Sequence, residues 1–281
     1  MNVGILGCAS VAKKYVIEAL KTTTEVEKVF IASRDEKKAQ STAKEFGIEF
    51  KKSYEEIVND SEIGAVYVPL PIGLHEEWVL KAAEKGKHII CEKSISDSYE
   101  STKNMVAACK AKKLTLFENF MCDYHPQHSK VLSMIHDKEI GNISTIKTYF
   151  GFPPLDKKSF RYDKNLGGGS LNDAGAYTTF IARKMLETEP LAATCTLKTD
   201  STGVDIQGSA FLEFPDDKSS LISFGFDNVY QNNYSIWGSQ GLITVNRAFS
   251  IPPDMKPSVQ LYKNKNFQEK TTEIDVPPAN Q

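Results

Sequence analysis

The stretch "GILGCASVAKK", residues 4–14, decides the fold of the N-terminal part of the chain. An apolar run leads into a turn of small residues, and helical spacing begins directly after it. Aligned with the dinucleotide-binding pattern G-x-G-x-x-G, the turn reads Gly7, Ala9 and Ala12, so only the first glycine is kept. Glycine allows a tight turn and a close approach of the backbone to a pyrophosphate at a helix N-terminus. The turn therefore predicts a nucleotide-binding strand–helix unit, with an ordinary strand-to-helix turn as the alternative.

Strands and helices alternate over the first 122 residues. Apolar segments at residues 28–33, 65–71, 88–93 and 114–120 alternate with helical segments at residues 10–22, 35–47, 74–86 and 98–113. Repetition at this interval predicts an α/β fold, a doubly wound parallel sheet with helices on both faces. The strands are nearly all apolar, as strands buried on both faces are. We therefore predict a dinucleotide-binding Rossmann domain over residues 1–122.

The pattern changes from residue 123 onward. A helix over residues 125–141 and a glycine-rich loop with a helix over residues 167–186 are followed mainly by alternating strands. Segments 205–214 and 220–226 flank the turn "PDDKS", and this arrangement is typical of an antiparallel hairpin. We therefore predict a second α+β domain with an open, mainly antiparallel sheet over residues 123–281, which binds the substrate and forms oligomer contacts.

Composition excludes several classes of protein. The chain has 281 residues, of which 41% are hydrophobic and 25% charged, with a net charge of −2. This is typical of a soluble globular protein, with no basic field for nucleic acid or an anionic membrane. We see neither a cationic leader nor an apolar run of about 18 residues, so we expect a cytoplasmic protein without membrane contact. Five cysteines without C-x-x-C and five scattered histidines indicate reduced thiols and no metal site.

The end of the second apolar segment predicts which cofactor is bound. Many NAD-binding proteins have an acid here for the ribose hydroxyls, whereas this chain has Ser33 and Arg34. A guanidinium suits the 2′-phosphate of NADP, and Lys37 or Lys38 adds positive charge. We therefore expect NADP(H) to be preferred, although the neighbouring Asp35 leaves NAD possible.

A carboxylate and an ammonium follow the apolar strand "HIIC", residues 88–91. Strands often end in charged residues simply because they end in water, but Glu92 and Lys93 stand where open α/β sheets bind ligands, at the carboxyl end of a parallel strand. This position makes Glu92 and Lys93 candidate residues of a binding site.

Three segments together resemble one family. These are "AVYVPLPIGLHEEWVLKAAEKGKHIICEKSIS", residues 65–96, "ENFMCDYHPQ", residues 118–127, and "LGGGSLNDAGAYTTFIARKML", residues 166–186. They resemble, in the correct order, segments of the glucose–fructose oxidoreductase/inositol dehydrogenase (Gfo/Idh/MocA) family. The resemblance implies an N-terminal Rossmann domain that binds NAD(P), and a C-terminal domain that carries substrate residues and commonly a subunit interface.

The resemblance also implies roles for individual residues. Lys93 would be the catalytic lysine, with Glu92 holding it, while Asp173 and Tyr177 would complete the catalytic set. Arg161, Asp173 and Tyr177 would bind the substrate. Combined with the turn and strand-end positions above, the expected cofactor-binding residues are Gly7, Ala9, Ser10, Val11, Ser33, Arg34, Lys38, Pro69, Leu70, His75, Glu92, Lys93 and Glu118.

Tyr177 places the chain in a subgroup by resemblance. Many dehydrogenases of the family have a histidine four residues after the motif aspartate, and this chain has Tyr177 four residues after Asp173. The tyrosine resembles the subgroup of glucose–fructose oxidoreductase, dihydrodiol and xylose dehydrogenases and deoxysugar ketoreductases. At this spacing both side chains would face one side of a helix. A nearby ammonium favours the phenolate, so Lys93 and Tyr177 would together move the proton of a hydroxyl group.

The resulting functional hypothesis is an NAD(P)-dependent oxidoreductase that interconverts a secondary alcohol and a ketone on a sugar-like substrate. The alternatives are a dehydrogenase for an inositol or a trans-dihydrodiol, an enzyme for a nucleotide-linked deoxysugar, or a regulator that binds NAD(P) without turnover. Ser94 in place of the proline of the family's E-K-P motif, and the end of the chain soon after "DVPP", favour the regulator weakly.

We expect a homo-oligomer, a dimer or tetramer, formed through the outer face of the second sheet. The expectation rests on apolar side chains in the alternating strands, and it assigns Phe211, Leu221, Phe224 and Trp237 to that outer face.

Overall fold

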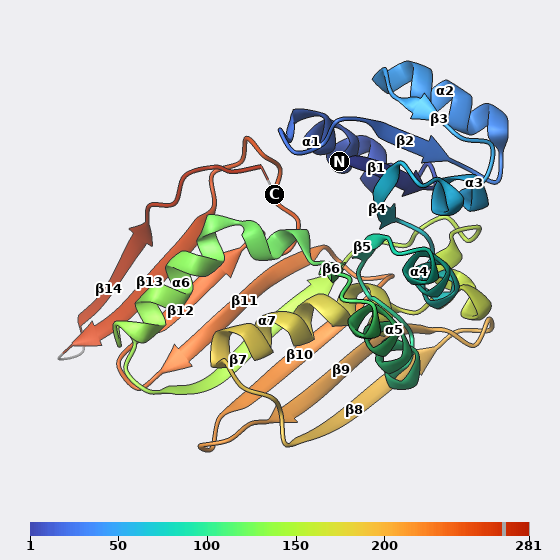
Figure 1. The fold of residues 1–281 in the computed structure, drawn as a ribbon. Helices are drawn as coiled ribbons and strands as arrows, with labels where there is room; N and C mark the ends of the chain where they lie inside the picture. Colours follow the sequence, from blue (N-terminus) through green and yellow to red (C-terminus); the bar gives the residue numbers. More distant parts are fainter. Residues whose placement is uncertain (266–267, 281) are drawn as a thin grey trace. The chain divides into compact units, whose positions relative to one another are not determined.

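The computed structural model describes residues 1–265 and 268–280, and the backbone only at residue 265. The chain forms two compact units (Figure 1). Unit 1 comprises Met1–Asn119 with Asn165–Gly167, and unit 2 comprises Phe120–Lys164 with Gly168–Gln281. The domain boundary proposed between residues 122 and 123 stays a proposal. Each unit is described by itself.

Unit 1 contains a parallel sheet with the strand order β3-β2-β1-β4-β5-β6. Its strands are β1 (Asn2–Leu6), β2 (Val29–Ala32), β3 (Glu49–Phe50), β4 (Ile63–Val68), β5 (His88–Glu92) and β6 (Leu116–Asn119). Its helices are a π-helical turn (Ala12–Val16), α1 (Ile17–Thr22), α2 (Glu36–Phe46), α3 (Tyr54–Asn59), a 3-10 turn (Ile72–Leu74), α4 (His75–Glu84) and α5 (Tyr99–Ala111). This order is the doubly wound topology of dinucleotide-binding domains, and it confirms the predicted α/β fold.

Adjacent residues of the central strand β1 belong to different core clusters. Ile5 packs with Ile31 and Tyr67, whereas Leu6 packs with Phe30 and a second set of apolar residues. Since successive side chains of a strand point to opposite faces, apolar side chains must cover the sheet on both faces. This packing explains why the strands are apolar throughout rather than alternating.

Side-chain caps fix where the helices of unit 1 begin. The side chains of Asp35, Ser53 and Ser98 accept hydrogen bonds from the first turns of α2, α3 and α5. Such caps satisfy amide groups that have no partner within the helix. A capping oxygen is itself occupied by this bond. The Asp35 carboxylate, for example, accepts a hydrogen bond from the Lys38 amide at 3.2 Å and so holds the start of α2.

Unit 2 is built on a sheet with the order β14-β13-β12-β11-β7-β10-β9-β8. Its strands are β7 (Ile143–Gly151), β8 (Ala192–Thr199), β9 (Asp205–Glu213), β10 (Ser219–Gly225), β11 (Gln231–Gly238), β12 (Leu242–Asn246), β13 (Ser258–Lys265) and β14 (Gln268–Ile274). All neighbouring pairs are antiparallel except β7 and β10, which run parallel. The sheet confirms the predicted mainly antiparallel architecture.

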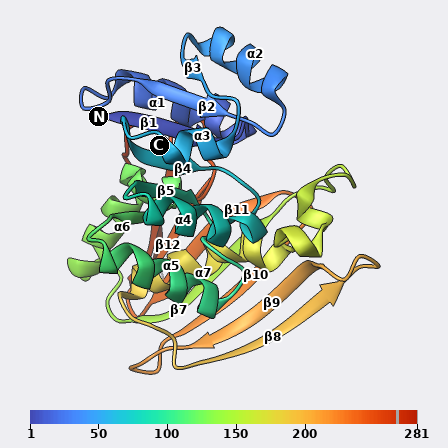
Figure 2. The ribbon, with the colours of Figure 1, turned by 45° about the vertical axis from the view of Figure 1, so that its right-hand side comes forward.

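Two helices cover one face of this sheet, α6 (Pro126–His136) and α7 (Ala176–Leu186) (Figures 1 and 2). Val131 of α6 and Ile181 of α7 are fully buried in one core cluster with Ile146, Ile222 and other strand residues. The sheet therefore has its apolar core on the helix side.

The other face of the sheet bears exposed apolar side chains. Phe211 and Leu221 are each 40% exposed and directly paired across β9 and β10, and Trp237 on β11 is 59% exposed. The expectation that Phe224 shares this face is wrong, because Phe224 is 3% exposed and lies in the helix-side core. Leu221 and Phe224 are three residues apart in one strand, and side chains at odd spacing point to opposite faces.

Candidate active site

The first turn of unit 1 has the geometry that a dinucleotide requires. Gly7 has φ +119°, a conformation that side-chain-bearing residues rarely adopt. A Cβ added there would lie 3.3 Å from Leu70 Cδ2 and 3.4 Å from the Tyr54 hydroxyl, so the turn is already backed by side chains. The chain then enters the π-helical turn that begins at Ala12. The residues present therefore fit a pyrophosphate at this helix N-terminus, although the helix begins with a wider turn than the regular helix that we expected.

The end of β2 places a guanidinium beside a buried tyrosine. The Arg34 guanidinium lies close enough to the Tyr54 hydroxyl for its charge to act on it, and the Tyr54 ring packs edge-on to Trp78 with centroids 5.0 Å apart. Burial raises the pKa of the Tyr54 hydroxyl, and the charge of Arg34 acts in the opposite direction. Ser33 is buried and its hydroxyl accepts from the Asp35 amide at 3.2 Å. Sequence reasoning missed Tyr54, because it opens the short helix α3, which carries too few residues for a periodic signal.

His75 is a structural tie within unit 1 and is fully buried. Its Nε2 lies 2.8 Å from the Leu70 carbonyl, and its Nδ1 lies 3.1 Å from the carbonyls of Ser94 and Ile95. Burial lowers the pKa of the imidazole, while the carbonyl contacts act against that shift. His75 thus links the Pro69–Pro71 loop to the segment after Lys93. Both of its nitrogens face backbone carbonyls, and the cofactor contact of His75 stays a prediction.

Glu92 is held from two neighbouring strands. Its Oε1 accepts hydrogen bonds from the Tyr67 hydroxyl at 2.6 Å and from the Asn119 side-chain amide at 2.7 Å. Tyr67 is fully buried, and burial together with the negative charge of Glu92 raises the pKa of its hydroxyl. Sequence reasoning did not find Tyr67 or Asn119. A tyrosine in an apolar strand is the signal that could have found Tyr67, but it is a weak one.

Lys93 follows β5 directly and is partly exposed. The peptide bond between Lys93 and Ser94 is cis. Two residues later, the Ile95 amide donates to the Glu118 carboxylate at 2.8 Å, so Glu118 of β6 holds the chain as it leaves β5. Glu92 and Glu118 therefore flank the lysine along the backbone, which supports the sequence-based interpretation that Glu92 helps to position it.

In unit 2 the two predicted polar substrate residues form one ion pair. Arg161 Nε donates to Asp173 Oδ2 at 2.5 Å, and the guanidinium also lies 4.8 Å from the ring centroid of Phe160. Partial burial strengthens such charge-assisted bonds. The pair presents a preorganised set of donors and acceptors, which suits the hydroxyl groups of a polyol.

Tyr177 lies in an aromatic cluster at the start of α7. Its ring centroid is 5.1 Å from Phe150 and 5.6 Å from both Phe120 and Phe249. These contacts fix the plane of the ring. Asp173, in contrast, lies on the π-helical turn Leu171–Gly175 that precedes α7. A π turn is wider than a regular helical turn, and the common face of Asp173 and Tyr177 stays a prediction.

A carboxylate that the sequence analysis did not single out fixes the glycine-rich loop. Asp205 Oδ2 accepts from the Ser170 hydroxyl at 2.7 Å and from the Leu171 amide at 2.6 Å. A Cβ on Gly169, whose φ is +123°, would lie 2.3 Å from Asp205 Oδ1. The glycine is therefore required by the close approach of Asp205, which anchors the segment that carries Asp173.

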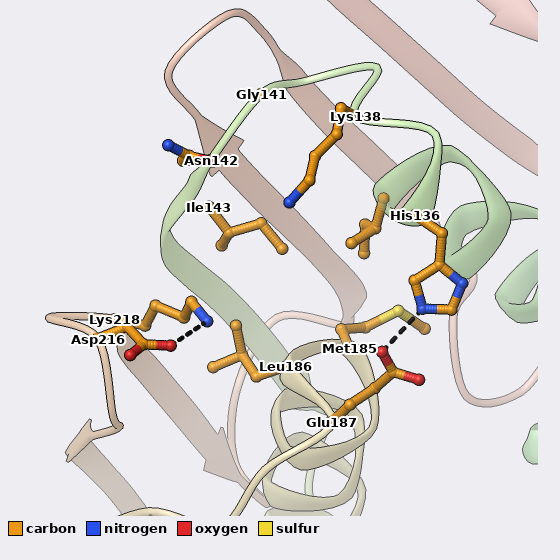
Figure 3. A pocket seen from close by; sticks show the side chains of 11 residues that line it. His136, Lys138, Gly141, Asn142, Ile143, Met185, Leu186, Glu187, Asp216 and Lys218 are labelled. Atoms are coloured by element: carbon orange, nitrogen blue, oxygen red, sulfur yellow. Dashed lines mark hydrogen bonds and ion pairs between the residues drawn. The ribbon is translucent and has the colours of Figure 1, made fainter.

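A cavity of about 580 Å³ lies at the other end of α7 and does not include the predicted site residues. It is lined by Ile135, His136, Lys138, Gly141, Asn142, Ile143, Met185, Leu186, Glu187, Asp216 and Lys218 (Figure 3). Its His136 and Lys218 are paired with Glu187 at 2.7 Å and Asp216 at 3.1 Å. Among the described residues, no cluster of three or more histidine, cysteine or acidic side chains could hold a metal ion. Nor does that part of the chain contain a helix long and apolar enough to cross a membrane.

Comparison with known proteins identifies the family. Residues 1–120 match the model of an oxidoreductase family with an NAD-binding Rossmann fold, and residues 128–244 match the GFO/IDH/MocA C-terminal domain. The chain belongs to the GFO/IDH/MocA oxidoreductase family. This confirms the resemblance inferred from the three sequence segments, whereas the tyrosine subgroup stays a prediction.

Among curated GFO/IDH/MocA relatives, two are 35% identical to this chain. One is the dTDP-3,4-didehydro-2,6-dideoxy-alpha-D-glucose 3-reductase of Saccharopolyspora spinosa, over 93% of this chain and 79% of the relative. The other is the D-xylose 1-dehydrogenase (NADP(+)) 2 of Haloferax volcanii, over 90% of this chain and 78% of the relative. Among solved structures, the 3-ketoreductase KijD10 from Actinomadura kijaniata, in complex with NADP and TDP-benzene, is similar with a TM-score of 0.91 and 31% identity. That match covers 98% of this chain and 85% of KijD10.

Proposed function

We propose that this GFO/IDH/MocA enzyme is an NADP-dependent oxidoreductase that interconverts a secondary alcohol and a ketone on a sugar-like substrate. The observation that carries the proposal is the position of Lys93 at the carboxyl end of β5, directly after a glutamate held by Tyr67 and Asn119. Ligands bind at the carboxyl ends of strands in folds of this topology. The relatives support the reaction class, since they are named as NADP-dependent or NADP-bound enzymes of sugars.

The cofactor, when bound, supplies the hydride acceptor or donor. Gly7, Ala9, Ser10 and Val11 would hold its pyrophosphate through backbone groups of the first turn. Ser33, Arg34 and Lys38 would bind the 2′-phosphate, because a guanidinium suits a phosphate group and the neighbouring Asp35 carboxylate caps α2. Pro69, Leu70, Glu92, Lys93 and Glu118 would border the nicotinamide, and His75 would hold that border in place.

Two residues would handle the proton of the reacting hydroxyl. Tyr177 would donate a proton to the carbonyl oxygen during reduction and accept it back during oxidation, with the Lys93 ammonium favouring its phenolate form. Arg161 and Asp173 would orient polar groups of the substrate through their fixed ion pair.

The direct test is turnover. Purified protein is mixed with NADPH or NADP⁺ and a panel of sugars, keto-sugars and nucleotide-linked sugars, and the nicotinamide absorbance is followed. The proposal expects turnover of at least one sugar-like substrate. Tight NADP(H) binding without turnover across the panel would instead support the alternative of a non-catalytic NAD(P)-binding regulator.

We further propose that the protein is a homo-oligomer that uses the exposed face of the second sheet. Phe211, Leu221 and Trp237 support this proposal, because large apolar side chains on one surface are costly to leave in water. A cytoplasmic location stays an expectation from the sequence.

A further inference from the structure

An arginine and a tyrosine in unit 2 form a stacked pair that the proposed mechanism does not use. Arg247 Nη1 donates to the Tyr230 hydroxyl at 2.9 Å, and the guanidinium carbon lies 4.8 Å from the centroid of the Tyr230 ring. Tyr230 is 38% exposed, and Arg247 is also exposed. Tyr230 precedes β11, and Arg247 follows β12. The pair is thus built from two separate loops that meet at one end of the sheet.

Buried polar side chains hold these two loops. The Asn232 side chain, 4% exposed, donates to the Tyr230 hydroxyl at 2.8 Å and accepts from the Phe249 amide at 2.7 Å. Gln127, which is fully buried, donates to the carbonyl of Arg247 at 3.3 Å. Arg247 itself has φ +56°, an uncommon conformation outside glycine. Backbone in sparsely populated regions persists where its surroundings enforce it, and such residues gather at ligand sites.

Arg247 differs in its partner from the other two arginines of unit 2. Arg161 and Arg183 form ion pairs with Asp173 and Glu189. Among the ion pairs of the described residues, none involves Arg247. Its guanidinium therefore keeps an uncompensated positive charge at the surface.

The Tyr230 hydroxyl is arranged to donate. It accepts hydrogen bonds from both Arg247 and Asn232, which uses its two acceptor positions. Its own proton is then left to donate outward, next to the remaining N–H groups of the guanidinium. A planar fork of N–H donors beside an O–H donor, with net positive charge, matches the oxygens of a phosphate group.

This donor pair borders the aromatic cluster that contains the proposed proton donor. Phe249, two residues after Arg247, has its ring centroid 5.6 Å from Tyr177 and 5.2 Å from Phe150. The Asn232 side chain that holds Tyr230 also binds the Phe249 backbone. Asn232 and Phe249 therefore join the loops of Tyr230 and Arg247 to the Tyr177 cluster.

We propose that Arg247 and Tyr230 bind a phosphate group of the substrate, so that the preferred substrates are sugars carrying a phosphate ester or a nucleoside diphosphate. This inference rests on the proposed function and narrows its substrate class. The Saccharopolyspora relative is named as a reductase of a dTDP-sugar, which agrees with this inference. The observations that carry it are the Arg247 guanidinium without an ion-pair partner among the described residues and the fixed Tyr230 hydroxyl.

The test is a calorimetric titration of dTDP and of glucose 1-phosphate into protein saturated with NADP⁺. Loss of one charge-assisted contact costs about tenfold to a hundredfold in affinity. We therefore expect binding by the wild type and a loss of that size for Arg247→Gln. Tyr230→Phe, which removes only the hydroxyl, should weaken binding by about threefold to tenfold. Arg183→Gln, which removes a paired arginine of the same unit, is the matched control and should bind as the wild type does.

A second titration separates the two possible sources of phosphate. NADP⁺ affinity should be unchanged in Arg247→Gln, because the guanidinium serves the substrate. Reduced NADP⁺ affinity with unchanged dTDP affinity would overturn the inference, since the pair would then bind the cofactor. Absence of binding by both phosphate compounds in the wild type would also overturn it. If the wild type binds neither phosphate compound but turns over unphosphorylated sugars, the proposed function stands and the phosphate-binding inference fails. If dTDP binding depends on Arg247 but no substrate is turned over, the phosphate-binding inference stands and the proposed function fails.

Discussion

The Tyr67 hydroxyl donates a 2.6 Å hydrogen bond to Glu92, across the two neighbouring strands β4 and β5. The acceptor, Glu92, directly precedes Lys93, the proposed catalytic lysine. Asn119 donates to the same carboxylate oxygen from β6. The carboxylate is thus held from both sides of its own strand, which fixes the backbone from which Lys93 extends.

Replacing Tyr67 by phenylalanine should destabilise the protein without opening a large cavity. The substitution removes one bond to a charged acceptor, so the free energy of unfolding should fall by about 1.5–3 kcal/mol. Urea unfolding measures this change. Tyr99→Phe, which alters a tyrosine that is 75% exposed, should change the free energy of unfolding little. Equal stabilities for the two variants would show that the Tyr67 bond contributes nothing.

Replacing Lys93 by alanine or Tyr177 by phenylalanine should remove most turnover and leave NADP(H) binding in place. Loss of a general acid typically costs about 10² to 10⁴ in rate. Because the two groups would act as a unit, the double variant should be little slower than the slower single variant. Stopped-flow turnover and cofactor titration together measure both effects. A wild-type rate for Tyr177→Phe would mean that the ring only packs against Phe150 and Phe249 and that another group moves the proton.

Arg34→Ala should weaken NADP⁺ binding far more than NAD⁺ binding. Loss of a charge-assisted contact to the 2′-phosphate costs about 1.5–3 kcal/mol, or roughly tenfold to a hundredfold in affinity. Tyr54→Phe, which removes the hydroxyl beside the Arg34 guanidinium, should reduce the NADP⁺ preference in the same direction but by less. Fluorescence titrations of both cofactors give the two ratios. Equal affinities of the wild type for NADP⁺ and NAD⁺ would refute the assigned role of Arg34.

The free energy of unfolding should fall as the pH is lowered from about 6.5 to about 4. These limits are the usual pKa of a histidine and the pKa of His128 in the folded protein. His128 is fully buried, with Nε2 2.9 Å from the Ala248 carbonyl and Nδ1 3.1 Å from the Tyr234 hydroxyl. Burial lowers its pKa to about 4, so the unfolded chain takes up a proton first. The free energy of unfolding should therefore drop by about 2 kcal/mol between roughly pH 7 and pH 5 from this residue alone.

Burial lowers the pKa of His75 and His125 as well, so both add to the His128 effect in the same direction. Urea titrations of the wild type and of His128→Gln at both pH values isolate the His128 share, with His136→Gln as an exposed control. A pH dependence in His128→Gln as steep as in the wild type would contradict the assignment.

The proposed oligomer should dissociate when charge is placed on the exposed face of the second sheet. Leu221→Glu or Trp237→Glu would put a carboxylate into any interface formed there, and burying an unpaired charge is strongly unfavourable. Tyr99→Glu, on α5 of unit 1, is the control. Sedimentation velocity should show a dimer or tetramer for the wild type and the control, and a smaller species for the two sheet variants. A monomeric wild type at high micromolar concentration would rule out this assembly.

Long periodic segments were predictable from the sequence, and residues joined across strands were not. The apolar strands and the helices α2, α4 and α5 carry strong patterns, so their type and order followed directly. The short elements β3 and α3 do not, and with α3 the sequence analysis missed Tyr54. Glu92 was predicted from its place beside Lys93, but its partners Tyr67 and Asn119 come from strands whose register no single sequence reveals. The prediction for Phe224 is wrong because apolar character alone does not tell the two faces of a strand apart, whereas its odd spacing from Leu221 does.

The parallel pairing of β7 with β10 also affects how the protein is made. Thr145 pairs with Ser219, and the intervening chain includes the glycine-rich loop, α7, β8 and β9. Closing so long a segment costs entropy before any contact compensates for it, and such distant pairings slow folding. During synthesis, β7 leaves the ribosome well before either of its neighbours, β10 and β11, exists. Both edges of β7 therefore stay unpaired until the chain beyond α7, β8 and β9 has been made.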